Sequence, residues 1–285
     1  PTQPAPSKTV KKKESLPLKK PETIIKRSAN PVGKSSSVRQ PHEALTDDQG
    51  NIYPENITVD GEHLVAYGDL IVGEARYIDE YRNGERPLYV PTPRLWPKGD
   101  IPFYVQAGIS LEQVKIIKTI AKDLKEKVGV NLHPIDSPNG AYLRIVPGEN
   151  NCYATVGYSD DVSTMSLSPG CKYGDIYHEV FHVLGFFHEQ NRFDRDDYLK
   201  ILWENIDEKF WNQFEKFSER SFPPAIQEIP FSFKSFMLYD PKSFSISEDY
   251  TMVNLYGEPY SVFSSSPTEV DYERLKNLYH DELSF

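Results

Sequence analysis

Apolar residues recur every three or four positions between Val114 and Val128, which predicts an amphipathic helix with one buried face. The segment also has a start signal, because the Ser110 hydroxyl and the Gln113 side chain can each satisfy a free backbone N–H of the other in a capping box. Gly129, directly after the last apolar position, predicts the helix end. We therefore expect one well-defined helix in the first half of the chain.

Short apolar stretches on both sides of this helix predict β-strands. They lie at 102–105, 143–146 and 164–167. Together with the helix they indicate an α/β region from about 83 to 190. The remainder, from about 191 to 285, is rich in aromatic residues, Pro and Ser and has fewer regular patterns.

Two helical patterns stand out in this second half. Residues 207–217 have a mixed helical pattern. Ser266 can cap a C-terminal helix that has Pro267 at its first position and continues through Tyr279. We expect this helix to be the last regular element.

The first 45 residues differ in composition from the rest. Residues 1–40 contain ten basic and two acidic residues and carry a net charge of +8. The chain as a whole has a net charge of −10, so the remaining residues carry −18. Many Pro and Ser and few aromatic residues predict a disordered tail over 1–45. The basic run Lys11–Lys13 lacks interleaved aromatic residues, which favours a solvated tail over a nucleic-acid-binding arm. Residues 46–82, with apolar patches, are expected to form a short compact segment ahead of a main domain at 83–285.

Length and composition allow a sizeable core, since 38% of the 285 residues are hydrophobic. We expect no membrane span, because the sequence has no apolar run of the length that crosses a bilayer. The two cysteines, Cys152 and Cys171, leave three possibilities open. They are inert thiols, part of a second metal site, or a disulfide worth about 3 kcal/mol in the loop-entropy description.

The chemistry is concentrated between residues 178 and 188, which read His-Glu-Val-Phe-His-Val-Leu-Gly-Phe-Phe-His. On a helix, His178 and His182 share one face and can bind one Zn²⁺. Gly185 can end the helix in a sharp turn that brings His188 back as a third ligand. Three protein ligands leave a position for water, which is typical of catalytic zinc sites, and Glu179 is placed to take a proton from that water.

Several further motifs resemble the astacin family of metzincin proteases. H-E-x-x-H-x-x-G-x-x-H is the metzincin zinc motif, and Glu189 follows its last histidine as in astacins. Residues 192–198 resemble the astacin continuation R-x-D-R-D-x-Y, and 235–239 resemble the family's Met-turn. Residues 94–102 resemble the start of an astacin catalytic domain. The likeness runs from about residue 83 to the C-terminus, and Leu238 and Asp240 depart from the Met-turn pattern.

The resemblance implies an α+β metzincin fold, with an upper mixed sheet plus helices, a mostly irregular lower half, and one zinc ion in the cleft between them. It implies that His178, His182 and His188 bind the zinc. Glu179 would be general base and then general acid, and Tyr239 would donate a hydrogen bond to the oxyanion.

The resemblance also assigns structural roles. Met237 would lie beneath the zinc, and Glu189 would pair with the N-terminus of the mature chain. Cys152 and Cys171 would form one of the family disulfides.

The segment before the catalytic domain resembles an inhibitory propeptide. Residues 66–70 are similar to the astacin propeptide motif F-x-G-D, although Ala66 replaces its Phe. The resemblance implies that Asp69 binds the zinc in the latent form, with His63 as the alternative ligand. Activation would need a cut by another protease, for which the bond between Arg82 and Asn83 is the best candidate.

Together these observations predict a secreted, monomeric zinc endopeptidase with protein or peptide substrates and its own propeptide as inhibitor. The substrate is expected to lie extended against an edge strand near 164–167. The sequon at Asn56 has meaning in a secreted eukaryotic protein. Two alternatives remain, namely a protease of another metzincin class and a non-catalytic secreted protein that retains zinc.

Overall fold

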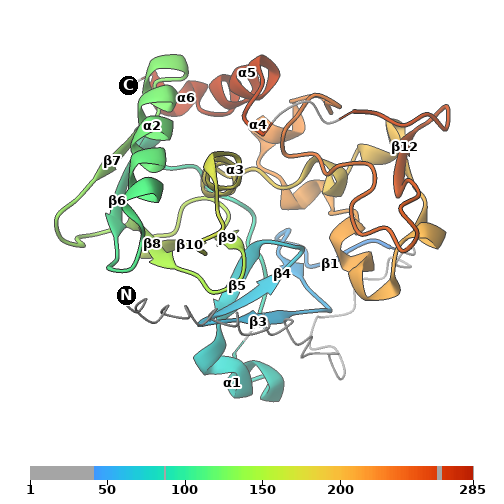
Figure 1. Cartoon of the computed structure of the whole chain (residues 1–285), viewed down its shortest axis with the longest axis horizontal. Coiled ribbons are helices and arrows are strands. Elements are labelled where there is room, and N and C mark those ends of the chain that lie inside the picture. The colour runs from blue at the N-terminus through green and yellow to red at the C-terminus, as the bar shows by residue number, and fades with distance from the viewer. Residues whose placement is uncertain (1–41, 87, 262–264, 285) are drawn as a thin grey trace, which may run out of the picture.

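A computed structural model describes residues 42–86, 88–261 and 265–284. Its centre is a mixed eight-stranded sheet, and helices pack beside it while the C-terminal half is mostly irregular (Figure 1). The expected α+β architecture is therefore confirmed. In spatial order the strands are β3 (Thr58–Asp60), β4 (His63–Ala66), β5 (Leu70–Glu74), β9 (Cys152–Ala154), β10 (Val162–Leu167), β8 (Tyr142–Pro147), β6 (Asp100–Val105) and β7 (Asn131–Pro134).

The three strands predicted in the α/β region are present as β6, β8 and β10, and they pair in parallel, as does β7 with β6. The predicted helix is α2 (Leu111–Lys127), which follows β6 and packs against β7. Its capping box forms as expected, since the Gln113 N–H donates to the Ser110 hydroxyl at 3.1 Å. Ile120 and Leu124 on its inner face are fully buried, which supplies the packing that an isolated helix lacks.

The C-terminal half has little regular structure. The helical pattern at 207–217 forms a 3₁₀ helix, η6 (Glu208–Phe214), rather than an α-helix. The last long helix, α5 (Glu269–Leu278), begins later than the sequence indicated. Its N-cap is Thr268 and not Ser266, because Thr268 has Asp271 three residues on and completes a capping box with it.

The remaining elements are short. They are β1 (Leu45–Thr46), β2 (Ile52–Tyr53), η1 (Ala75–Tyr77), α1 (Ile78–Asn83), η2 (Pro97–Gly99), α3 (Tyr173–Val183), η3 (Glu189–Asn191), η4 (Arg195–Asp197), β11 (Leu199–Ile201), η5 (Trp203–Asn205), η7 (Glu219–Ser221), α4 (Pro224–Gln227), β12 (Met252–Asn254) and α6 (His280–Leu283).

The N-terminal segment packs against both halves of the molecule. His42 stacks on Trp203 with ring centroids 3.6 Å apart, and the Ala44 N–H donates to the Lys216 carbonyl at 2.9 Å. Residues 42–45, expected in the tail, thus belong to the packed part of the chain. The expected disorder of 1–41 lies outside the described residues.

Strands β3, β4 and β5 extend the sheet beyond β9 (Figure 1). Strand β5 pairs in parallel with β9 at Leu70 and Ala154. Strand β10 is paired on both sides, with β9 and with β8, so the expectation that 164–167 is an edge strand is wrong. Strand β9 lies between β10 and β5. If β5 were removed, the strand exposed at that edge would therefore be β9 and not β10.

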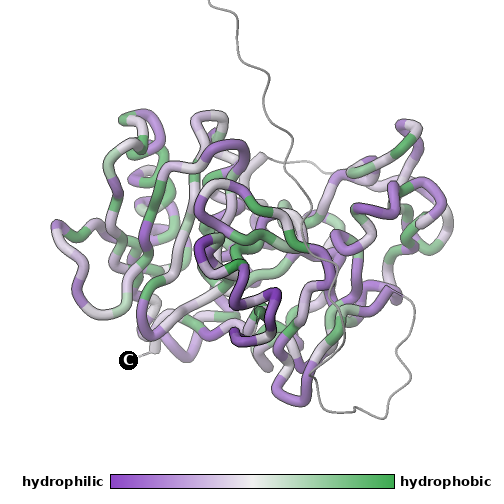
Figure 2. The backbone as a smooth tube through the Cα atoms, turned by 90° about the horizontal axis from the view of Figure 1, so that it is seen from below, coloured by the Kyte–Doolittle hydropathy of each residue, from purple (hydrophilic) through white to green (hydrophobic). Residues whose placement is uncertain are grey.

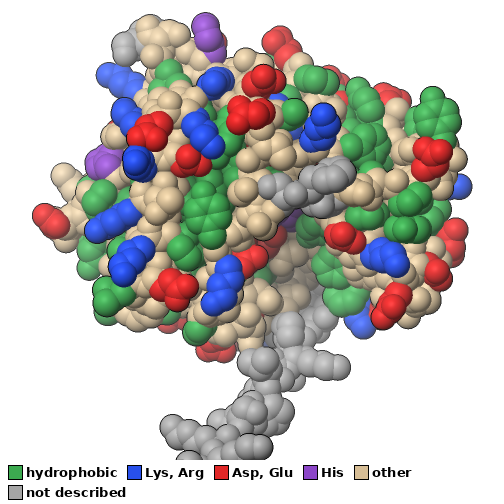
Figure 3. Space-filling model, turned by 45° about the horizontal axis from the view of Figure 1, so that its top comes forward, with side chains coloured by type: hydrophobic (Ala, Val, Ile, Leu, Met, Phe, Trp, Pro, Cys, Tyr) green, Lys and Arg blue, Asp and Glu red, His purple; other side chains and the backbone are tan. Residues whose placement is uncertain are grey.

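A continuous hydrophobic core lies under the sheet and around α3, and a second cluster fills the C-terminal half. Hydrophobic stretches run through the middle of the molecule, while hydrophilic ones are prominent in outer loops (Figure 2). Cys152 and Cys171 form a disulfide that ties β9 to the segment before α3. Acidic and basic side chains are interspersed on the face drawn in Figure 3. In the described part of the chain, no helix combines the length and hydropathy needed to cross a membrane.

Candidate metal centre

Helix α3, which lies between the sheet and the C-terminal half, carries two of the three motif histidines on one face. The Asp175 carboxylate accepts a hydrogen bond from the Lys172 N–H at 2.7 Å and caps the helix start. His178 and His182 lie one turn apart, with ring centroids at 4.8 Å. Nδ1 of His182 lies 2.7 Å from the Phe186 carbonyl oxygen, so Nε2 is the nitrogen that faces the cluster.

The third histidine is returned to the cluster by a glycine turn. Gly185 has φ 104°, a conformation that L side chains rarely adopt. The Phe186 N–H donates back to the Phe181 carbonyl at 3.0 Å and closes the helix end. The chain then reverses and brings Nε2 of His188 within 3.0 Å of Nε2 of His178.

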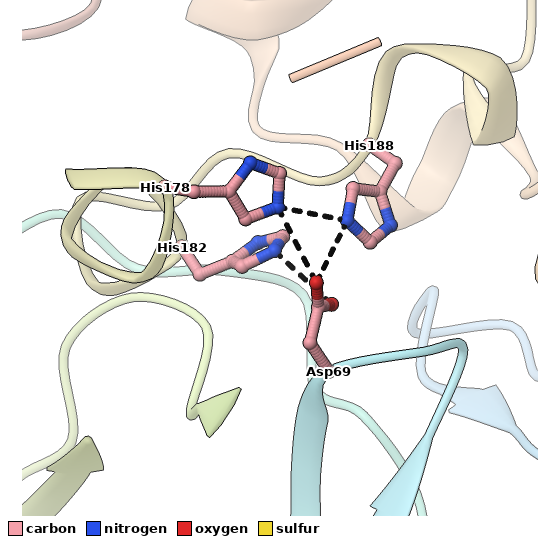
Figure 4. Close-up of side chains that lie close together, drawn as sticks. All are labelled: Asp69, His178, His182 and His188. Atoms are coloured by element: carbon pink, nitrogen blue, oxygen red, sulfur yellow. Dashed lines mark hydrogen bonds and ion pairs between the residues drawn. The ribbon is translucent and has the colours of Figure 1, made fainter. Parts of the chain in front are cut away.

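A carboxylate from the N-terminal segment points at all three rings (Figure 4). Oδ2 of Asp69 lies 3.3 Å from Nε2 of His178 and 3.2 Å from Nε2 of His188, and Oδ1 lies 3.2 Å from Nε2 of His182. Among the described residues these four form the candidate metal cluster, whereas His63 lies elsewhere, in β4. Gly68 has φ 99°, and a Cβ there would collide with the Tyr239 hydroxyl. This close approach explains why the residue before Asp69 in the motif is a glycine.

The four donors fit one zinc ion. Tetrahedral zinc with bonds of about 2.0 Å has ligand atoms about 3.3 Å apart. The 3.0 Å between Nε2 of His178 and Nε2 of His188, and the 3.2–3.3 Å between the histidine nitrogens and the Asp69 oxygens, match that spacing. The buried Oδ1 of Asp69 and Nε2 of His182 also have no hydrogen-bond partner among the described groups. Buried, unsatisfied ligand atoms that face each other at this spacing indicate a metal site.

The electrostatics of the cluster favour a charged Asp69 carboxylate and a neutral His188 imidazole. Burial alone would raise the pKa of Asp69, but His188 and His182 hold it well below its ordinary value. Burial lowers the pKa of His188 to about 4, although the Asp69 carboxylate acts in the opposite direction. Neutral imidazole and ionised carboxylate are the forms that bind zinc.

Glu179 lies on α3 beside the cluster and is almost fully buried. Its Oε2 has no hydrogen-bond partner among the described groups, and both Glu179 and His178 line the cleft. Burial raises the pKa of Glu179 well above its ordinary value, and the negative charges of Asp69 and Asp175 add to the shift. A group of this kind can accept a proton and return it.

The turn at 235–239 lies directly beneath the third histidine. Met237 is 1% exposed, and its carbonyl accepts the Glu189 N–H at 3.0 Å. The Tyr239 ring packs on His188 with centroids 4.6 Å apart, while its hydroxyl donates to Oε1 of Gln213 at 3.3 Å. In the uncleaved chain Tyr239 is therefore tied to Gln213, a partner that the sequence did not suggest.

Glu189, the residue after the third histidine, has a cation partner in the uncleaved chain. Nη2 of Arg274 lies 2.9 Å from Oε1 and 2.8 Å from Oε2 of Glu189, and both side chains are buried. The Ser232 N–H donates to Oε1 at 2.8 Å. The expected pairing of Glu189 with a mature N-terminus stays a prediction, because the uncleaved chain has no such terminus.

His178 and Asp69 line a cleft of about 640 Å³ between the sheet and the C-terminal half. Tyr153 of β9 lines it, and its hydroxyl donates to Oδ2 of the buried Asp60 at 2.6 Å. Sequence reasoning missed this contact, as it missed Gln213 and Arg274. Each is an ordinary polar residue far along the chain from its partner, and no local pattern distinguishes it.

Comparison with known proteins agrees with this geometry. The family model described as Astacin, a peptidase family, matches residues 90–280. Zinc metalloproteinase nas-15 of Caenorhabditis elegans is 33% identical over 163 residues, which cover 56% of this chain and 28% of that protein. Zinc metalloproteinase nas-4 of the same organism is 32% identical over 193 residues, which cover 65% of this chain and 59% of that protein. The chain thus spans less than two thirds of the length of these relatives.

A solved structure shares the fold. High choriolytic enzyme 1, a hatching enzyme zinc-protease from Oryzias latipes, aligns with a TM-score of 0.58 and 24% identity over 66% of this chain and 94% of that chain. The family model spans more than half of the sequence and includes the three histidines and the turn at 235–239. This chain belongs to the astacin family.

Proposed function

We propose that this chain is a zinc-dependent endopeptidase that is made as a latent zymogen and cleaves proteins or peptides. The observation that carries the proposal is the Asp69 carboxylate, 3.2–3.3 Å from all three histidine Nε2 atoms. Its family membership supports the chemistry, since the relatives are named zinc metalloproteinases and the His₃–Asp cluster can hold one zinc ion. The alternative of another metzincin class is excluded by the match to the astacin family.

His178, His182 and His188 would hold the zinc. When bound, zinc polarises a carbonyl and makes a nearby water acidic enough to attack at neutral pH. Glu179 takes the proton of the attacking water and delivers it to the leaving amine, because its carboxylate faces the same cleft. Tyr239, once released from Gln213, donates its hydroxyl where negative charge develops on the substrate carbonyl.

Latency follows from the way the N-terminal segment fills the cleft. Asp69 takes the position a water needs, and β5 occupies the edge of β9 where a peptide would add a strand. Tyr67 is fully buried and packs edge-to-face on Phe217. A substrate can reach the histidines when this segment leaves.

Release requires a cut by an activating protease after Asp69, and we propose the Arg82–Asn83 bond. This bond lies at the end of α1, a six-residue helix without a fully buried residue. Proteases bind extended chains, and such a helix unfolds at little cost. We place the protein outside the cell, because its Cys152–Cys171 disulfide is stable in oxidising compartments. We expect it to act as a monomer.

The test is cleavage of casein by the purified chain before and after limited trypsin treatment. Activity that appears with the loss of residues up to about 82, and that a chelator abolishes, supports the proposal. The control is Glu179→Gln, which retains the three histidines and should remain inactive after the same treatment. A trypsin-treated chain that binds zinc and cleaves no peptide in a proteome-derived library would identify a non-catalytic zinc protein instead.

A further inference from the structure

The carboxylate next to the third histidine is already neutralised inside the fold. Glu189 is 2% exposed and accepts Nη2 of Arg274 at both oxygens, at 2.8 and 2.9 Å. Its Oε1 also accepts the Ser232 N–H at 2.8 Å, and Nε of Arg192 lies 4.0 Å away. Arg274 and one backbone donor thus satisfy this buried negative charge, because the Arg192 guanidinium is itself paired with Asp194 at 2.8 Å.

The same helix that supplies Arg274 also holds the turn beneath the cluster. Asp271 lies three residues earlier on α5, so the two side chains share one helix face. Asp271 accepts the Ser235 hydroxyl at 2.8 Å and the Phe236 N–H at 3.3 Å. Helix α5 therefore anchors the zinc-ligand loop through Arg274 and the Met-turn through Asp271.

We propose that Arg274 is the permanent partner of Glu189 and a positioning residue for His188, so that the metal site is complete before the propeptide is cut. The inference rests on the proposed function, because it concerns how that zymogen becomes active. A new N-terminal ammonium would be a second cation beside Glu189, which Arg274 already neutralises. Activation then consists of removing the propeptide and does not depend on where the new N-terminus begins.

The first experiment varies the N-terminus of the cleaved chain. Forms that begin at Asn83, Arg86 or Leu88, and an Asn83 form extended by two glycines, are compared by kcat/KM on one peptide. We expect values within about twofold of each other. A form that is more than tenfold better than the others would overturn the inference, because it would show that one N-terminus completes the site.

The second experiment does not require activity. Arg274→Gln is introduced into the uncleaved and cleaved forms, and Tm and zinc affinity are measured for each. We expect the same loss in both forms, because Arg274 keeps its partner after cleavage. A lower Tm or zinc affinity in the uncleaved form, with no change in the cleaved form, would overturn the inference, because the new N-terminus would then replace Arg274.

Two control variants distinguish a specific role of Arg274 from a general effect of charge or stability. Lys276→Gln changes the charge of an exposed residue on the same helix and should alter neither quantity. If Arg274→Gln does not fold, Arg274→Lys retains the charge and should recover most of the zinc affinity. Chains that bind zinc but cleave nothing would refute the proposed function, while the comparison of the two forms would still decide the role of Arg274.

Discussion

The uncleaved chain should gain activity when the Asp69 carboxylate is removed. Asp69→Ala deletes a buried charged group that lies 3.2–3.3 Å from three imidazole nitrogens. A hydrogen bond to a charged group contributes about 1.5–3 kcal/mol, which corresponds to roughly a 10- to 150-fold change in an equilibrium. The fraction of chains with an open cluster, and with it kcat/KM, should rise by that factor.

The activity should nevertheless stay below that of the cleaved enzyme, because the rest of the segment keeps its contacts. Tyr67 remains buried, and the Ala154 N–H still donates to the Asp69 carbonyl at 2.9 Å. These contacts do not involve the deleted carboxylate. The variant therefore separates blocking of the metal from covering of the cleft.

The assay is hydrolysis of a fluorogenic peptide by the uncleaved chain, in an Arg82→Gln background that resists activation. Asp69→Asn is the matched control, since it keeps the shape of the side chain and loses its charge, and its activity should lie between the parent and Asp69→Ala. The reasoning is refuted if Asp69→Ala is as silent as the parent while zinc binding and folding are unchanged.

Four other outcomes follow from the same contacts. Glu179→Gln in the cleaved form should lower kcat by about 10²- to 10⁴-fold and leave zinc content unchanged, as measured by metal analysis. Asp60→Ala should lower the free energy of unfolding of the uncleaved chain by about 1–3 kcal/mol in urea, because it leaves the buried Tyr153 hydroxyl without its acceptor; an unchanged midpoint would contradict this. Reduction of the Cys152–Cys171 disulfide should lower the free energy of unfolding by about 3 kcal/mol, measured in urea in the same way. Burial lowers the pKa of His188 to about 4, so below about pH 6.5 the unfolded state binds a proton that the folded state does not. The free energy of unfolding of the metal-free, chelator-treated chain should therefore fall by up to about 3 kcal/mol between pH 6.5 and pH 4. A free energy of unfolding that stays constant across that window would refute this prediction.

The sequence predicted the parts of the site that local geometry determines. His178 and His182 are brought together by the helical repeat, and Gly185 is recognisable because the turn needs a positive φ. Asp69 was within reach because Gly68 and Asp69 form a short motif. Local spacing therefore identified the three histidines, while Asp69 was expected from the resemblance of its segment to the astacin propeptide motif.

Long-range partners could not be derived in the same way. Arg274 lies 85 residues from Glu189, and any of the 32 Lys and Arg residues in the chain was a possible partner. The start of α5 was misplaced for a related reason. Ser266 and Thr268 are both good caps, and the choice depends on whether Asp271 can reach back, which only the folded helix end decides.

The pairing of β5 with β9 bears on how the proposed propeptide would occupy the cleft without presenting a bond for cleavage. The Ala154 N–H of β9 donates to the backbone carbonyl of Asp69, while the Asp69 side chain faces the histidines. That carbonyl is therefore directed at the sheet edge and away from the cluster. In the mechanism proposed above, a substrate would place a backbone carbonyl where Asp69 places its carboxylate, so it would replace β5 at β9 with a different backbone orientation. Pairing with β9 thus holds this segment in the cleft, and in the proposed zymogen the orientation of that pairing would protect the segment from cleavage.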